Sequence, residues 1–219
     1  MKVLVGTDFH GKQSVFEAFA EKAEENSVDA IVICGDVTHF GSLQEARRLL
    51  SLLIGLRVPV LFVPGNCDPP SLVGVDMEGV TCIHGKSVTY NNVTFLGVGA
   101  SPPTPFSTPF EMTEDEMMET LNRASSNLPI SQWFVLVSHT PPRNTQLDKT
   151  SIGLHVGSLS VRKYIEERQP SIVFCGHIHE AKGREKIGKT VIVNPGPVRH
   201  GDYIIALFNS EFALEPEML

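Results

Sequence analysis

The sequence contains few cysteines, and their spacing excludes two common roles. The four cysteines are Cys34, Cys67, Cys82 and Cys175, and no two of them form a C-x-x-C pair. Neither a zinc knuckle nor a thiol–disulfide redox motif is therefore present. A chain of 219 residues can bury a sizeable core without cross-links, so we expect a reducing compartment, the cytoplasm.

The chain also lacks a long apolar run and an excess of basic residues. No stretch approaches the ~18 apolar residues of a membrane span, and charged and polar groups interrupt the N-terminal segment too early for a signal peptide. The net charge is -7, and Lys and Arg cluster only weakly, so we expect neither a membrane partner nor a stable long nucleic-acid partner. A small phosphoester substrate, drawn into a locally positive site, remains compatible with this charge.

The remaining composition is that of an ordinary globular protein, with 42% hydrophobic and 20% charged residues. The sequence shows no repeat, low-complexity tract or linker, which indicates a single domain over residues 1–219. A homo-oligomer is compatible with this composition, but no sequence feature requires one.

The hydrophobic pattern alternates between the strand period and the helix period. In the first third, a β-α-β-α-β order predicts parallel strands joined by right-handed crossovers. Two polar pairs, Ser42 with Glu45 and Thr113 with Glu116, have capping-box spacing at helix starts. We expect strands at 2–6, 30–34, 58–63, 80–83, 87–90, 93–98, 133–138, 172–175, 186–190, 191–194 and 203–208, and helices at 13–25, 42–54, 113–126 and 158–168.

Polar side chains follow five of these strands, at the point where each strand ends. Ligands of open parallel sheets bind beyond the carboxyl ends of the strands, so we expect these side chains to meet at one sheet edge. The residues are Asp8, His10, Asp36, Asn66, His139, His177 and His179.

The types and spacing of these residues indicate a pair of metal ions. Imidazole and carboxylate ligands suit Mn, Fe, Zn, Ni or Co, and no obvious thiolate ligand is present. In extended backbone, residues two apart point the same way, which would pair Asp8 with His10 and His177 with His179. Each short motif arises often by chance, but packing alone does not explain all five in order at strand ends.

The blocks D-x-H, G-D, G-N-[HC]-[DE], H and G-H-x-H occur here in that order, between Asp8 and His179. This pattern resembles the calcineurin-like metallophosphoesterase superfamily, and the resemblance covers nearly the whole chain. It implies an α/β/β/α sandwich in which two mixed sheets are flanked by helices. The ligands that it implies are Asp8, His10 and His179 for one ion, Asn66, His139 and His177 for the other, and Asp36 as the bridge.

The short length, the Gly-Asn-Cys-Asp block and the Asn-Pro-Gly-Pro segment at 194–197 resemble small prokaryotic phosphodiesterases of this superfamily. We therefore expect a dinuclear metal-dependent phosphoester hydrolase, with a phosphodiesterase favoured and manganese expected before iron, nickel, cobalt or zinc. A metal-bridging hydroxide would attack the phosphorus in line. The alternatives are a phosphomonoesterase or nuclease that uses the same site, and a non-catalytic scaffold that binds proteins.

Cys67 occupies the position at which many superfamily members carry a histidine, which is proposed to protonate the leaving oxygen. A cysteine performs that role poorly, because nearby cations favour the thiolate, which cannot donate a proton. We therefore expect good leaving groups to react best. The alternative is that Cys67 only fills space, and the neighbouring Asp68 either orients a neighbour or serves as a turn residue.

Other candidates for substrate contact lie outside the five blocks. His155 precedes a helix start and could contact the phosphate or supply the missing acid. Arg143 and His200 are candidate phosphate contacts, as is Asn66, and His39 could support a ligand. For all but Asn66, an ordinary loop role is the alternative. The loop 100–109 and the following helix could form a wall over the site or contact another subunit.

Overall fold

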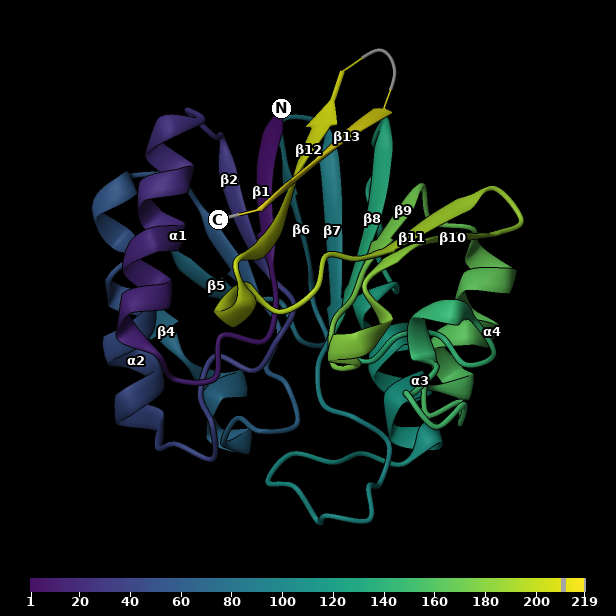
Figure 1. The fold of residues 1–219 in the computed structure, drawn as a ribbon. Helices are drawn as coiled ribbons and strands as arrows, with labels where there is room; N and C mark the ends of the chain where they lie inside the picture. Colours follow the sequence, from purple (N-terminus) through teal and green to yellow (C-terminus); the bar gives the residue numbers. More distant parts are fainter. Residues whose placement is uncertain (210–211, 219) are drawn as a thin grey trace.

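The computed structural model describes the backbone of residues 1–209 and 212–218. Two mixed β-sheets pack face to face, and two α-helices cover the outer face of each sheet (Figure 1). This arrangement is the α/β/β/α sandwich expected from the sequence.

The first sheet has the strand order 13-12-1-2-3-5-4 within the described residues. The adjacent strands β1, β2, β3 and β5 are parallel to one another. On the other side of β1, β12 and β13 continue the sheet in antiparallel pairs. The strands are β1 (Lys2–Gly6), β2 (Ala30–Ile33), β3 (Val60–Phe62), β4 (Asp76–Met77), β5 (Val80–Cys82), β12 (Asp202–Phe208) and β13 (Phe212–Met218).

The second sheet has the order 10-11-9-8-7-6 over the same described part of the chain. Its four central strands are parallel, and an antiparallel strand closes each edge. The strands are β6 (Ser87–Tyr90), β7 (Val93–Val98), β8 (Trp133–Ser138), β9 (Ile172–Phe174), β10 (Gly183–Ile187) and β11 (Thr190–Asn194). The helices are α1 (Gln13–Glu25) and α2 (Leu43–Ser51) on the first sheet, and α3 (Glu114–Ala124) and α4 (Leu159–Arg168) on the second.

Strand alternation divides the buried side chains among three cores. Leu4 packs with the helix residues Phe16 and Phe19 on the outer face of the first sheet, whereas its neighbour Val5 lies between the sheets. In the second sheet, Val137 faces the space between the sheets, and Leu136 packs toward α3 and α4. Because both faces of the central strands are covered, the sequences of these strands are continuous apolar runs.

Two of the expected helix starts are confirmed by their hydrogen bonds. The Ser42 hydroxyl accepts from the Glu45 backbone N–H at 3.2 Å, which caps α2. Thr113 and Glu116 form a reciprocal capping box at the start of α3. These bonds satisfy N–H groups that have no partner within the helix. None of the described helices is long and apolar enough to cross a bilayer.

Some expected boundaries are wrong, and three of the differences involve the edge strands β4, β10 and β13. The antiparallel pair at 186–194 forms, but its first strand begins at Gly183 and Thr190 belongs to the second. Residues 183–187 alternate between more and less exposed positions along the edge strand β10, so they give only a weak apolar signal. The strands β4 and β13 were not expected, since β4 has two residues and β13 contains Pro216. The second helix ends at Ser51 rather than residue 54.

Candidate metal centre

The structure brings all seven predicted ligands together where strands of the two sheets end. Three of the strands belong to the first sheet and two to the second, so the site lies across the join between the sheets. Asp8 and His10 follow β1, Asp36 follows β2, Asn66 follows β3, His139 follows β8, and His177 and His179 follow β9.

One group of ligand atoms is formed by Asp8, His10 and His179. The Nε2 atoms of His10 and His179 are 3.2 Å apart, and His179 Nε2 is 3.4 Å from Asp8 Oδ1. Atoms that bind one ion at about 2.0–2.2 Å lie roughly 3.0–3.5 Å from one another. The spacing of these three atoms therefore fits a single cation.

A second group is formed by Asn66, His139 and His177. His139 Nε2 lies 2.9 Å from Asn66 Oδ1, and the rings of His139 and His177 have centroids 4.9 Å apart. His139 is fully buried, and its Nδ1 lies 2.8 Å from the Cys34 carbonyl oxygen. Because that carbonyl can only accept, the His139 proton is on Nδ1 and Nε2 is free to bind a cation.

The Asp36 carboxylate lies between the two groups. Its Oδ2 is 3.6 Å from His10 Nε2, and its Oδ1 is 3.6 Å from His139 Nε2. The two oxygens thus face the two groups separately, which is the arrangement of a bridging ligand. The side chain is almost completely buried, so water does not screen its charge.

The environment of Asp8 tests whether a cation fits here. Its Oδ2 accepts hydrogen bonds from the Thr7 hydroxyl at 2.9 Å and from the His177 backbone N–H at 3.1 Å. Its Oδ1 is buried and has no hydrogen bond among the described residues. A buried carboxylate oxygen without a partner is costly unless a cation satisfies it. The residues therefore fit a metal ion.

Protonation at neutral pH suits metal binding at three of the ligands, whereas burial raises the pKa of Asp36, and Asp8 raises the pKa of His179 despite its burial. Burial lowers the pKa of both His10 and His177 to about 3, which keeps both imidazoles neutral. Burial alone would raise the pKa of Asp8, but His179 and the neighbouring imidazoles bring it well below its ordinary value. Neutral imidazole and ionised carboxylate are the forms that bind cations.

The backbone reaches this geometry in a different way from the one expected. Asp8, His10, Asp36 and His177 have positive φ values of 58°, 50°, 52° and 69°. The expectation of extended backbone at the D-x-H and H-x-H pairs is therefore wrong. Left-handed residues turn the chain sharply just beyond a strand, and such strain in residues other than glycine is concentrated at functional sites.

Arg199, which follows the Asn-Pro-Gly-Pro segment, contacts this cluster through His179. Its Nη2 lies 2.9 Å from His179 Nδ1, while its Nε is buried and has no hydrogen bond within the described part of the chain. Because a guanidinium only donates, this contact needs the His179 proton on Nε2, whereas binding of a cation through Nε2 needs it on Nδ1. The guanidinium therefore adds a positive charge beside the site, which favours phosphate binding. Sequence analysis did not identify this contact, and it missed Thr7 and the Cys34 carbonyl.

The Cys67 side chain lies beside Asp36, and Asp68 joins the surrounding loops. Burial raises the pKa of the Cys67 thiol, and the charge of Asp36 raises it further. Asp68 is fully buried and accepts from the backbone N–H groups of Thr38 at 2.7 Å and Gly65 at 2.9 Å. It thereby holds the loop that carries Asp36 against the loop that carries Asn66.

The other predicted contacts lie farther from the seven ligands. His155 Nδ1 bonds Asp148 Oδ1 at 2.7 Å, and no interaction found in the described residues joins it to a ligand. Arg143 is half-buried, and its backbone N–H donates to Ser158. His200 is exposed, with its ring centroid 6.5 Å from that of His179, so it is nearer to the ligands than the other two.

The loop 100–109 lies next to the segment that carries Asn66. The Ala100 N–H donates to the Pro64 carbonyl at 2.9 Å, and the Phe110 N–H donates to the Asn66 carbonyl at 3.1 Å. The Phe106 side chain, between these two anchors, is 84% exposed. The loop is thus a wall attached at both ends rather than a free lid.

The fold is that of a phosphoesterase domain, and the site contains groups of residues that could hold a metal ion. A sequence model of the calcineurin-like phosphoesterase superfamily domain matches residues 1–207. The chain belongs to this superfamily.

Curated relatives and solved structures agree with this assignment. Protein MJ1162 of Methanocaldococcus jannaschii is 40% identical over 201 residues, which cover 90% of this chain and 88% of that protein. A Vesicomyosocius okutanii protein named "Probable cyclic nucleotide phosphodiesterase" is 24% identical over 172 residues, covering 77% of this chain and 70% of that protein.

The fold is shared with TT1561 of Thermus thermophilus, at a TM-score of 0.76 and 19% identity over 99% of this chain and 98% of that one. It is also shared with a dimetal phosphatase from Danio rerio, at a TM-score of 0.68 and 12% identity over 100% and 96%.

Proposed function

We propose that the chain is a dinuclear metal-dependent phosphoesterase that acts best on phosphodiesters. The observation that carries the proposal is the Asp36 carboxylate, whose two oxygens face separate groups of ligand atoms at 3.6 Å each. Asp8, His10 and His179 would hold one ion, and Asn66, His139 and His177 the other. The relative and the fold neighbour whose names mention a phosphodiesterase and a dimetal phosphatase support this proposal.

The chemistry that such an ion pair supplies is a water molecule of lowered pKa and stabilisation of charge on the phosphate oxygens. The residues of the chain set the balance of charge around the phosphate. Asn66 contributes an amide oxygen without a negative charge, and Arg199 brings a cation to the rim beside His179. A phosphate group would therefore meet a net positive site.

The preference for diesters rests on the relative named as a phosphodiesterase, and a preference for good leaving groups rests on Cys67. Burial beside Asp36 raises its pKa and favours a neutral thiol that gives up its proton poorly, whereas nearby cations would favour the thiolate, which has no proton to give. In either form the leaving oxygen receives little help. An aryl phosphodiester needs little help because an aryl oxide is a stable leaving group. We propose a small phosphodiester as substrate and manganese as the first metal to test.

The first test compares two aryl substrates. Metal-stripped protein reconstituted with Mn²⁺ should hydrolyse bis(4-nitrophenyl) phosphate at least about tenfold faster than 4-nitrophenyl phosphate; the two esters share one leaving group, so the ratio of rates reports the preference for diester over monoester. Chelation should abolish the reaction, and added Mn²⁺ should restore it. A faster monoester reaction would favour the phosphomonoesterase alternative, and a folded protein that neither binds metal nor turns over would favour the scaffold.

The second test restores a proton donor by the substitution Cys67→His. General acid catalysis contributes about 10²–10⁴-fold, so we expect at least a tenfold gain on alkyl esters, whose leaving groups are poor, and little gain on aryl esters. The control is Cys67→Asn, which has a similar shape but no proton to transfer. An equal response of both variants across leaving groups would contradict the proposed role of position 67.

A further inference from the structure

The Nδ1 atom of His10 points away from the other ligands, and its contact there has no role in the proposal above. His10 Nε2 faces His179 at 3.2 Å and Asp36 Oδ2 at 3.6 Å, so Nε2 is the atom placed to bind a cation. A neutral imidazole that binds through Nε2 carries its proton on Nδ1, and that proton needs an acceptor. His139 meets this requirement through the Cys34 carbonyl at 2.8 Å.

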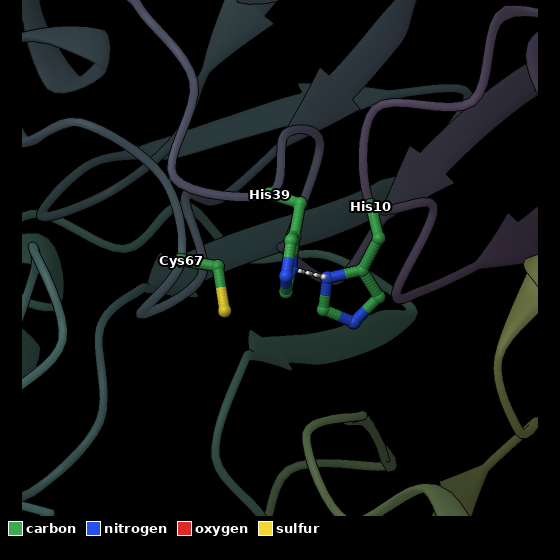
Figure 2. A group of neighbouring side chains, drawn as sticks. All are labelled: His10, His39 and Cys67. Atoms are coloured by element: carbon green, nitrogen blue, oxygen red, sulfur yellow. Dashed lines mark hydrogen bonds between the residues drawn. The ribbon is translucent and has the colours of Figure 1, made fainter. Parts of the chain in front are cut away.

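The partner of His10 is another histidine. His10 Nδ1 lies 3.2 Å from His39 Nδ1, and the two rings are 5.1 Å apart at an interplanar angle of 75° (Figure 2). Two ring nitrogens form a hydrogen bond only if one carries a proton and the other offers a lone pair. With His10 bound through Nε2, His10 is the donor, and His39 accepts through Nδ1 and keeps its own proton on Nε2.

The loop around His39 is held on both sides, although the His39 side chain is exposed. Before it, Asp68 accepts hydrogen bonds from the backbone N–H of Thr38 at 2.7 Å and from its hydroxyl at 2.8 Å. After it, the Phe40 N–H donates to the Cys67 carbonyl at 3.0 Å, and the Phe40 ring lies 4.7 Å from the His39 ring. The acceptor is therefore presented in a defined place.

We propose that His39 is a positioning residue that fixes the tautomer and orientation of His10 for metal binding. This inference rests on the proposed metal centre and adds a residue outside the five sequence blocks. Such acceptors behind a ligating histidine typically change metal affinity by about 10–100-fold. The Cys67 sulfur and a ring nitrogen of each of the two histidines all lie within 4.8 Å of one another, and Asn66 Nδ2 donates to this sulfur at 3.8 Å.

The test uses two substitutions of nearly equal shape. In His39→Asn, the amide oxygen takes roughly the place of Nδ1 and still accepts a hydrogen bond, whereas His39→Leu has the same branched outline without an acceptor. Metal-stripped proteins are titrated with Mn²⁺ alone in a calorimeter, and the affinity of each bound equivalent is measured. Thermal unfolding of the metal-free variants verifies that they are folded.

We expect the wild-type chain to bind two equivalents. His39→Leu should weaken one equivalent by about 10–100-fold and leave the other nearly unchanged, while His39→Asn should stay within about threefold of wild type. Unchanged affinity in His39→Leu, or equal weakening in both variants, would overturn the positioning role. The positioning role would also be overturned if the wild-type chain bound a third Mn²⁺ that His39→Leu lost while it kept the first two, because His39 would then be a ligand itself. A wild-type chain that binds no Mn²⁺ would instead refute the proposed function.

Discussion

Asp36→Asn is expected to lower kcat/KM on an aryl phosphodiester by about 10³-fold or more. The substitution keeps the size of the side chain but removes the negative charge that faces both ligand groups at 3.6 Å. The two groups would then lose their shared ligand, and with it several kcal/mol of charge stabilisation in the transition state, where each 1.4 kcal/mol is about tenfold in rate.

The same substitution should make the metal-free protein more stable at neutral pH. Burial raises the pKa of Asp36 above its ordinary value of 3.8, so the folded state holds the proton more tightly than the unfolded chain does. The stability from this group is present below the ordinary pKa and is lost as the pH rises through the raised value. Asparagine cannot ionise, and its amide oxygen can still accept the Cys67 N–H that now bonds Asp36 Oδ1 at 2.9 Å.

Asp68→Asn is the matched comparison for these two effects. Asp68 is equally buried, but its oxygens accept from backbone N–H groups of both loops instead of facing the ligand groups. Burial raises the pKa of Asp68 to about 6, but Asp68→Asn would turn an NH₂ group toward backbone N–H donors, so the substitution should lower stability. The measurements are urea unfolding in the presence of a chelator, and rates with Mn²⁺. If Asp36→Asn destabilised the metal-free protein and retained full activity, its role as a bridge would be wrong.

The convergence of the ligands could be predicted from the sequence because it follows from topology. Parallel strands end at one sheet edge, so Asp8, Asp36 and Asn66 must come close once β1, β2 and β3 are adjacent. His139 and His177 follow two neighbouring strands of the second sheet in the same way. The strand periods and the residue types carry this information locally.

The sequence suggested that His39 could support a ligand, but the ligand that it contacts, and the other contacts behind the ligands, depend on loop conformation and not on element order. His39 reaches His10 only because Asp68 and Cys67 hold its loop in place. Arg199 reaches His179 through a turn in which Gly201 has a φ of 91°. Side chains that approach across such turns leave no periodic signal, and a carbonyl acceptor such as that of Cys34 leaves no signal in residue type.

Gly65→Ala is expected to abolish binding of both metal ions and to destabilise the fold. A Cβ atom at this position would overlap Asp36 Oδ1 and the Asp36 backbone nitrogen, and it would lie 2.7 Å from the carboxyl carbon of Asp36. The backbone nitrogen cannot move aside without shifting the β2 loop. Overpacking of this kind costs about 1–3 kcal/mol, and here the displaced group is the proposed bridge.

Gly74→Ala provides the control, since a Cβ there meets nothing within 4 Å and the residue follows the same strand β3. Its unfolding free energy and its Mn²⁺ stoichiometry should match those of the wild-type protein. For Gly65→Ala we expect a lower denaturation midpoint and less than one bound equivalent. The two measurements separate damage to the metal site from loss of stability. General destabilisation alone would still leave the folded fraction able to bind two ions. If folded Gly65→Ala bound two ions with normal affinity, the close approach of the two loops would not be needed to place Asp36 between the ligand groups.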